Sequence, residues 1–226
     1  TEVFQRSREV IIAMDLSKSM LAEDIKPNRL ERAKLVVESL LDNLQGESVG
    51  LVVFAGTAFL QSPMSPDYQI LRGFLKDLNP DFIPQGGTNY DAMLETVLDS
   101  FKQSDSRADR FLIVISDGES LDNSWSQHVE ALKAQNARAI CLGFGTTEGG
   151  LIPDGQGGYH KDSAGAVVLT QLEAETLKSL ASQTGGVFRE ANVWVDLATL
   201  IEETVKRGAI GETGSLSQSV HIERYQ

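Results

Sequence analysis

The chain has 226 residues, a length that suits one large domain, and its hydrophobic fraction of 41% is sufficient for a buried core. It carries 20 Lys and Arg against 32 Asp and Glu, and the net charge of −12 opposes binding to nucleic acid or to an anionic membrane surface. Cys141 is the one cysteine, which excludes an intrachain disulfide framework and a cysteine-rich metal cluster.

Apolar runs rich in β-branched side chains alternate with helical patterns along most of the chain. Because the longest of these runs lack polar alternation, they are typical of strands buried on both faces of a parallel sheet. Strands are predicted at Glu9–Met14, Val49–Phe54, Phe111–Ser116 and Ala139–Phe144, with a shorter edge strand at Thr57–Met64.

Between these strands, apolar side chains recur at the three-to-four spacing of amphipathic helices. The first predicted helix covers Leu30–Leu44 and is entered through Pro27, a residue type that favours the first turn. Thr170 and Glu173 have the spacing of a capping box that would start a later helix. Further helices are predicted at Tyr90–Phe101, Val129–Ala134, Leu177–Ala181 and Asp196–Lys206.

This alternation predicts an α/β fold with a doubly wound, mainly parallel six-stranded sheet and helices on both faces, because parallel strands need crossover connections that helices provide. One domain is expected over residues 1–207. Within it, the Gly-rich segment 146–170 is expected to form a β-hairpin insertion. Residues 208–226 lose the periodicity and are expected to be a tail or linker toward a missing transmembrane helix.

In an open α/β sheet, ligands bind beyond the carboxyl ends of the strands, so polar residues that follow the apolar runs are candidates for a site. The first predicted strand is followed by Asp15, Ser17 and Ser19, and a later strand is followed by Asp117. A loop with two adjacent glycines brings Thr88 to the start of a helix. These segments together supply carboxylates and hydroxyls.

All of these side chains offer hard oxygen donors, with no imidazole or thiolate among them. The set suits Mg²⁺, and to a lesser degree Mn²⁺ or Ca²⁺, better than Zn²⁺ or Cu²⁺. Neutral hydroxyls, with carboxylates that act through water, would neutralise such an ion only in part. The ion would then take an Asp or Glu carboxylate of a partner protein as a further ligand.

The pattern Asp15-x-Ser17-x-Ser19, followed by Gly87-Thr88 and by Asp117-Gly118, resembles the metal-ion-dependent adhesion site of von Willebrand factor type A domains. The resemblance covers about residues 8–207. It implies a protein-binding module without enzymatic activity, in which the two serines and the threonine hold the metal ion. The two aspartates would act mostly through bound water.

A second set of motifs resembles the BatB-like branch of the bacterial aerotolerance (Bat) proteins. These motifs are Asp15–Met20, Ala22–Leu30, Gly50–Gly56 and Pro63–Tyr68. The resemblance implies that flanking helices, missing from this chain, anchor the domain in a bacterial inner membrane so that it faces the periplasm. It also implies other Bat-type proteins or a MoxR-type AAA+ ATPase system as partners, in complex assembly or stress tolerance.

An alternative is a metal-dependent phosphohydrolase of the haloacid-dehalogenase type, whose nucleophilic aspartate would be Asp15. Such enzymes need a second carboxylate two residues later as acid and base, and Ser17 occupies that position. The histidines lie in unrelated sequence contexts, which gives little support to a metal site formed by all three together.

Overall fold

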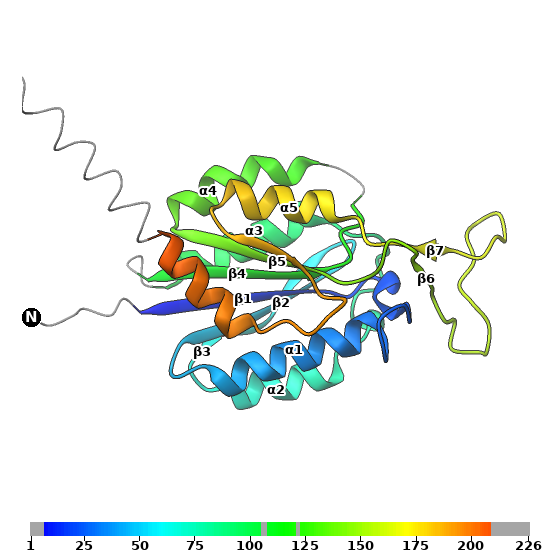
Figure 1. Cartoon of the computed structure of the whole chain (residues 1–226), viewed down its shortest axis with the longest axis horizontal. Coiled ribbons are helices and arrows are strands. Elements are labelled where there is room, and N and C mark those ends of the chain that lie inside the picture. Colours follow the sequence, from blue (N-terminus) through cyan, green and yellow to red (C-terminus); the bar gives the residue numbers. More distant parts are fainter. Residues whose placement is uncertain (1–6, 105–107, 121–122, 209–226) are drawn as a thin grey trace, which may run out of the picture.

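A computed structural model describes residues 7–104, 108–120 and 123–208. Its centre is a six-stranded sheet in the order β3-β2-β1-β4-β5-β8 (Figure 1). The strands are β1 (Arg8–Asp15), β2 (Ser48–Phe54), β3 (Ala58–Ser65), β4 (Asp109–Ser116), β5 (Ala137–Gly143) and β8 (Val187–Glu190). β3 is antiparallel to β2, and the other neighbouring pairs are parallel. The predicted doubly wound, mainly parallel α/β sheet is confirmed.

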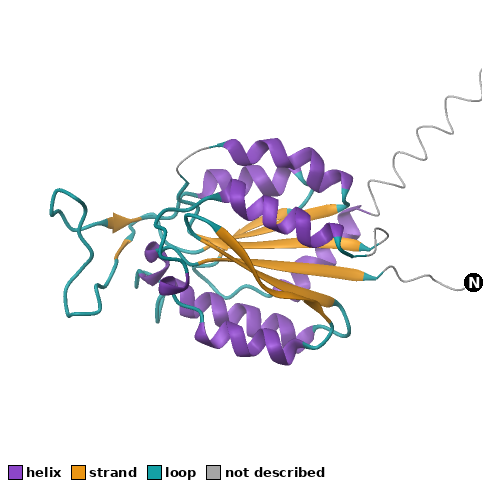
Figure 2. Ribbon diagram, turned by 180° about the vertical axis from the view of Figure 1, so that it is seen from behind, coloured by secondary structure: helices purple, strands orange, loops and turns teal. Residues whose placement is uncertain are grey.

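Helices cover both faces of the sheet, as the unbroken apolar runs predict (Figure 2). In β1, Val10, Ile12 and Met14 belong to one hydrophobic core, whereas Ile11 and Ala13 belong to the other. The first core is completed by α1 (Arg29–Asn43), α2 (Tyr68–Asp77) and a helix at residues 197–208. The second is completed by α3 (Tyr90–Lys102), α4 (Val129–Ala134) and α5 (Ala174–Gln183).

The strand order reverses at the centre of the sheet. β2 lies on one side of β1 and β4 lies on the other. Because the connections from the two strands leave in opposite directions, a crevice forms beyond their carboxyl ends, where ligands bind in folds of this type. Asp15 ends β1 and Ser116 ends β4, so the polar residues that follow these strands meet at this edge.

The first helix agrees with the prediction to within one residue at each end, but Pro27 is not part of its first turn. α1 starts at Arg29, where the Asn28 side chain accepts a hydrogen bond from the backbone N–H of Glu31 at 2.8 Å. An asparagine in this position satisfies one of the unpaired N–H groups of the first turn. The cap, and not the proline, therefore sets the start of the helix.

The predicted capping box at Thr170 and Glu173 is wrong. α5 begins at Ala174, and its preceding residue makes no side-chain cap. Thr170 instead ends the short strand β7 (Leu169–Thr170), and its hydroxyl donates a hydrogen bond to the Glu119 carboxylate at 2.5 Å. A tertiary contact thus takes the hydroxyl that the local motif would have used.

Segment 146–170 contains the hairpin insertion. β6 (Gly150–Leu151) pairs antiparallel with β7, and two further bridges, Pro153 to Tyr159 and Lys161 to Val167, extend the hairpin. It projects beyond the carboxyl end of the sheet (Figures 1 and 2). The expected tail at residues 208–226 lies outside the described residues except for Gly208, which is part of the last helix.

Candidate metal centre

Asp15 forms the floor of the candidate site. It is 0% exposed at the end of β1. One of its oxygens, Oδ1, accepts a hydrogen bond from the backbone N–H of Ser17 at 2.8 Å, and the other, Oδ2, accepts one from the hydroxyl of Ser116 at 2.5 Å. The carboxylate is therefore fixed in one orientation by the turn that follows it and by the neighbouring strand.

The serines lie on the turn above this carboxylate. Ser17 precedes a short 3-10 helix, η1 (Lys18–Leu21), and Ser19 lies within it. The backbone N–H of Met20 donates to the carbonyl of Ser17 at 3.0 Å, which closes the turn. Both serines are nearly buried, and their hydroxyl oxygens are 2.9 Å apart. The turn thus directs two hydroxyls at the same point.

Thr88 is supplied by the loop before α3. The backbone N–H of Asn89 donates to the carbonyl of Ala55 at 2.8 Å, which holds the loop against the end of β2. The Asn89 side chain also caps α3 by accepting from the N–H of Ala92 at 2.9 Å. Thr88 is 6% exposed, and its hydroxyl bonds to none of the residues that the structure describes. It remains available as a ligand.

Asp117 follows β4 and is 0% exposed. The next residue, Gly118, has a φ of +84°, and a Cβ there would lie 1.9 Å from the carbonyl oxygen of Glu173. The backbone N–H of Glu173 donates to the Asp117 carbonyl at 2.8 Å. The start of α5 therefore packs directly on this loop, and glycine is needed for the close approach.

Arg29, which the sequence analysis did not single out, is a buried cation beside Asp117. Its guanidinium is 0% exposed, and Nη1 donates to Asp117 Oδ2 at 2.9 Å. Nε and Nη2 donate to the two oxygens of Asp24, both at 2.8 Å, and Nη1 and Nη2 reach the Thr170 hydroxyl and carbonyl at 3.1 Å. Arg29 therefore joins the candidate site to the base of the hairpin.

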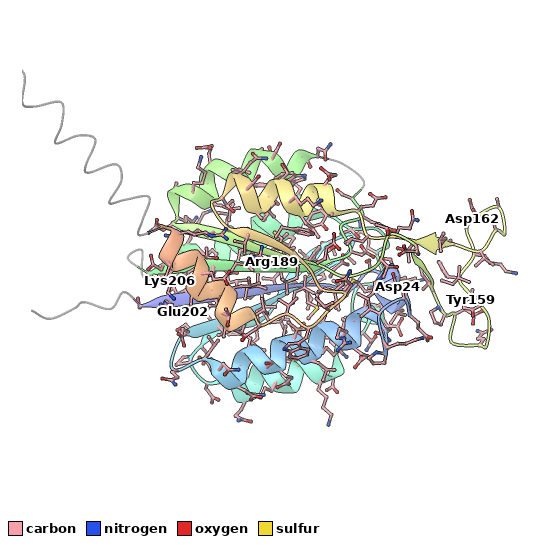
Figure 3. The ribbon with its side chains drawn as sticks, in the orientation of Figure 1. Asp24, Tyr159, Asp162, Arg189, Glu202 and Lys206 are labelled. Carbon is pink, nitrogen blue, oxygen red and sulfur yellow. The ribbon has the colours of Figure 1, made fainter. Side chains whose placement is uncertain are left out.

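A signal for Arg29 existed in the sequence. A cation in the first turn of a helix opposes the helix dipole, so an arginine there indicates a carboxylate partner from elsewhere in the fold. Asp24 is such a partner; it also accepts hydrogen bonds from the N–H and hydroxyl of Thr146 at 2.9 and 3.2 Å. Figure 3 places Asp24 at the base of the hairpin insertion.

Tyr90 is a second residue that sequence reasoning missed. Its hydroxyl lies 2.7 Å from the Ser116 hydroxyl, which in turn donates to Asp15. The chain of hydroxyls links the first turn of α3, close to Thr88, to the carboxylate at the floor of the site. No spacing rule points to such a link, because Tyr90 is also part of the apolar face of its helix.

Both aspartates are buried carboxyl groups whose pKa values are raised. Burial raises the pKa of Asp15 above its usual range, although hydrogen bonds from Ser116 and Ser17 oppose the shift. Burial also raises the pKa of Asp117, and the charge of Asp15 adds to this shift while Arg29 opposes it. A divalent cation between the two carboxylates would favour their ionised forms.

The donor set fits a hard divalent cation. In an octahedral Mg²⁺ shell with bonds of about 2.1 Å, adjacent oxygens are roughly 3.0 Å apart. The Ser17 and Ser19 hydroxyls form a hydrogen bond with each other at 2.9 Å, so their oxygens already lie close to this separation. The structure brings Asp15, Ser17 and Ser19 into one hydrogen-bonded turn, and it places Thr88 and Asp117 on the adjoining loops at the same edge.

Hollows adjoin the turn that carries the serines. One, of about 300 Å³, lies between Ser17, Lys18 and Gly86, with η2 (Pro80–Phe82) at its wall. Another, of about 380 Å³, is bounded by Lys18 and by the hairpin residue Ile152. The turn that carries the serines is therefore bordered by two hollows, and Lys18 lines both of them.

Known proteins resemble this chain in sequence and in fold. The von Willebrand factor type A domain family matches residues 10–119, a range that includes all the candidate ligands. BatB from Bacteroides thetaiotaomicron is 34% identical, and the match covers 90% of this chain and 99% of that protein with a TM-score of 0.81. An aerotolerance-related membrane protein from Bacteroides fragilis is 32% identical over 88% of this chain and 100% of its own, with a TM-score of 0.79.

A curated relative, the UPF0353 protein of Nocardia farcinica, is 26% identical over 209 residues. The match covers 85% of this chain and 61% of the relative, so the chain spans less than two thirds of that protein. The Bacteroides structures, in contrast, match along nearly their whole length. The chain belongs to the von Willebrand factor type A domain family, among the BatB-like domains of bacterial aerotolerance proteins.

Proposed function

We propose that the domain is a metal-dependent protein-binding module. Ser17, Ser19 and Thr88 would bind one Mg²⁺, with Mn²⁺ or Ca²⁺ as substitutes, and Asp15 and Asp117 would support it from beneath. The observation that carries the proposal is the pair of nearly buried serine hydroxyls, 2.9 Å apart, on the turn that Asp15 fixes. This spacing suits adjacent ligands of one small hard cation.

The ion would recruit a partner carboxylate. The hydroxyl ligands are neutral, and Asp117 is already paired with Arg29 at 2.9 Å, so part of its charge is compensated within the protein. A divalent cation at this place would keep net positive charge toward solvent. An Asp or Glu side chain of a partner would neutralise it, and the adjoining hollows would receive the neighbouring side chains of the partner.

We place the domain on a membrane-anchored Bat-type protein, facing the periplasm. The Bacteroides fragilis relative is described as an aerotolerance-related membrane protein, which supports membrane association. Among the described residues, no helix is both long and apolar enough to cross a bilayer. Both ends of the described chain lie at the amino ends of the parallel strands, opposite the candidate site (Figure 1). An anchor attached there would therefore leave the site facing away from the membrane.

Other Bat-type proteins or a MoxR-type AAA+ ATPase system are the proposed partners, in complex assembly or stress tolerance. The test is affinity capture of the full-length protein from native membranes, with Mg²⁺ or with EDTA. The proposal predicts that a partner co-purifies with Mg²⁺, that EDTA releases it, and that Thr88→Ala fails to retain it.

The matched control for this capture is Thr96→Ala, because Thr96 lies on α3 away from the site and its hydroxyl donates to the carbonyl of Ala92 within the same helix. This variant should retain the partner like the wild type. The same partners recovered in EDTA, or with Thr88→Ala, would contradict metal-dependent binding.

The phosphohydrolase alternative is not favoured. A nucleophilic aspartate must present an oxygen to its substrate, whereas Asp15 is 0% exposed and both of its oxygens already accept hydrogen bonds. We therefore expect no phosphate release from a generic phosphate ester with Mg²⁺.

A further inference from the structure

A second group of metal-ligating side chains lies on the outer side of α3. Asp91 and Glu95 are four residues apart on this helix, and His128 ends the 3-10 helix η3 (Ser124–His128) packed beside it. One potential ligand atom from each of the three side chains lies within 4.8 Å of the others. None of these residues takes part in the candidate site described above.

The backbone accounts for this convergence. Residues four apart on a helix project from the same face, so the carboxylates of Asp91 and Glu95 extend toward the same point. His128 is already oriented there, because its Nε2 lies 2.8 Å from Asp91 Oδ1. Asp91 is further held by the side-chain amide of Gln127, which donates to it at 2.8 Å. The imidazole and one carboxylate are thus positioned before any ion arrives.

The charge and exposure of the group also suit a cation. Two carboxylates near one imidazole carry uncompensated negative charge when the histidine is neutral. The side chains of His128 and Asp91 are 14% and 27% exposed, and Glu95 is exposed, so the group is partly enclosed but open to ions from solvent. Partial enclosure strengthens the attraction between the carboxylates and a cation.

We propose that Asp91, Glu95 and His128 bind one first-row divalent cation, for which Zn²⁺ is the best match. Zn²⁺ accepts both imidazole nitrogen and carboxylate oxygen as ligands, whereas Mg²⁺ prefers oxygen ligands alone. On binding, the imidazole Nε2 would present its lone pair to the metal, and Gln127 would remain as a hydrogen-bond donor to Asp91. Water would complete the coordination.

The position of this group gives the ion a structural effect. α3 begins two residues after Thr88, and η3 is the next element after the Asp117 loop. A cation held by both elements would fasten together the two segments that follow the loops of the first site. The inference does not depend on the first site binding metal.

The test is a Zn²⁺ titration of the domain in saturating Mg²⁺, followed by calorimetry and by NMR of the histidine ring nitrogens. The wild type should bind one Zn²⁺ per chain at this group, with a shift of the His128 ring signals. His128→Gln should lose this binding event, and Glu95→Gln should weaken it at least about 10-fold through loss of a ligand. Because Glu95 is on the surface, its substitution leaves the fold intact.

His160→Gln is the matched control, since His160 lies on the hairpin insertion and not near α3 in the sequence or in the fold. It should bind Zn²⁺ like the wild type, and all variants should have the same circular dichroism. The proposal would be overturned if the wild type did not bind Zn²⁺. It would also be overturned if His128→Gln and Glu95→Gln bound Zn²⁺ with the affinity of the wild type.

Discussion

At the scale of single residues, Arg29 has the greatest influence on the candidate site. Its guanidinium compensates Asp24 and Asp117 in a region from which water is excluded. Burial alone would lower the pKa of Arg29, but the hydrogen bonds to Asp24 and the charge of Asp117 outweigh burial and raise it. The cation therefore stays charged and holds the η1 turn, β4 and the hairpin base together.

Replacing Arg29 with Ala should destabilise the protein by about 3–5 kcal/mol, because it leaves buried carboxylates without a counter-ion. Urea unfolding followed by circular dichroism measures the change. Arg32→Ala, on the same helix but without a buried ion pair, should change the free energy of unfolding by only about 0.5 kcal/mol. Equal effects of the two substitutions would show that the buried pairs contribute nothing.

The protonation of Asp15 should make Mg²⁺ binding depend on pH. Burial raises the pKa of Asp15 to about 6. Protons therefore compete with the ion as the pH falls through this value, and the increase in Tm caused by Mg²⁺ should be larger at pH 8 than at pH 5. In the metal-free protein, stability depends on pH in the opposite direction. The folded state binds the Asp15 proton more tightly than the unfolded state, so the contribution of Asp15 to the free energy of unfolding falls as the pH rises from about 4 to 6.

Thermal melts with Mg²⁺ and with EDTA across this range measure both effects. Asp99→Asn is the control, because Asp99 is an exposed carboxylate on α3 and should leave the pH dependence unchanged. A Mg²⁺-induced shift in Tm of the same size at both pH values would contradict the assignment of Asp15.

At the scale of elements, the contact between the Asp117 loop and α5 sets the position of the site. Gly118→Ala would force a Cβ to within 1.9 Å of the Glu173 carbonyl oxygen. We expect a loss of roughly 2–4 kcal/mol of stability, from backbone strain and overpacking together, and weaker Mg²⁺ binding. Denaturant unfolding and Mg²⁺ calorimetry measure the two losses.

Gly157→Ala isolates the backbone part of this effect. Gly157 has a φ of +90°, but nothing lies within 4 Å of the position of its Cβ. This variant should lose about 1–2 kcal/mol and keep its affinity for Mg²⁺. If Gly118→Ala lost no more stability than Gly157→Ala and also kept its affinity for Mg²⁺, the close approach of α5 would have no role at the site.

Much of this architecture could be predicted from the sequence, for a physical reason. Strands buried on both faces must be apolar throughout, so β1, β2, β4 and β5 are recognisable as unbroken runs. β8 escaped notice because it has four residues, of which only Val187 is buried. α2 was also missed, since it contributes just Leu71 and Leu75 as buried residues.

The candidate ligands lie directly after strands or just before a helix, so their spacing can be recognised in the sequence. The hydrogen bonds and ion pairs of Arg29 cannot be recognised in this way. Arg29 meets Asp117 and Thr170 through packing between segments that are distant in the chain. The same packing explains why the hydroxyl of Thr170 donates a hydrogen bond to Glu119 and does not cap the start of α5.

At the scale of the whole molecule, the candidate site lies at the carboxyl ends of the parallel strands, and the ends of the described chain lie at the opposite ends of these strands. The hairpin projects beside the site, whereas Glu202 and Lys206 on the last helix lie at the other end (Figure 3). If the proposed anchor joins this end of the domain, the hairpin is directed away from the bilayer, which is toward the periplasm in the proposed orientation.

A single cysteine at the hairpin tip tests this orientation. Ala164→Cys, in the full-length protein, should react with a membrane-impermeant maleimide in intact cells whose outer membrane has been permeabilised, because Ala164 is exposed. Cys141 is buried, and burial raises the pKa of its thiol, so the matched protein in which Cys141 is the sole cysteine should stay unlabelled and serves as control. Labelling that requires lysis of the inner membrane would contradict the periplasmic orientation.

An amide NMR titration with Mg²⁺ shows whether Asp15, Ser17, Ser19, Thr88 and Asp117 form one Mg²⁺ site. We expect saturable shifts at the turn of Ser17 and Ser19 and at the loops of Thr88 and Asp117, all with one dissociation constant, and their loss in Asp15→Ala with the fold retained. Shifts confined to other parts of the domain, or the same shifts in Asp15→Ala, would contradict the assignment of this site.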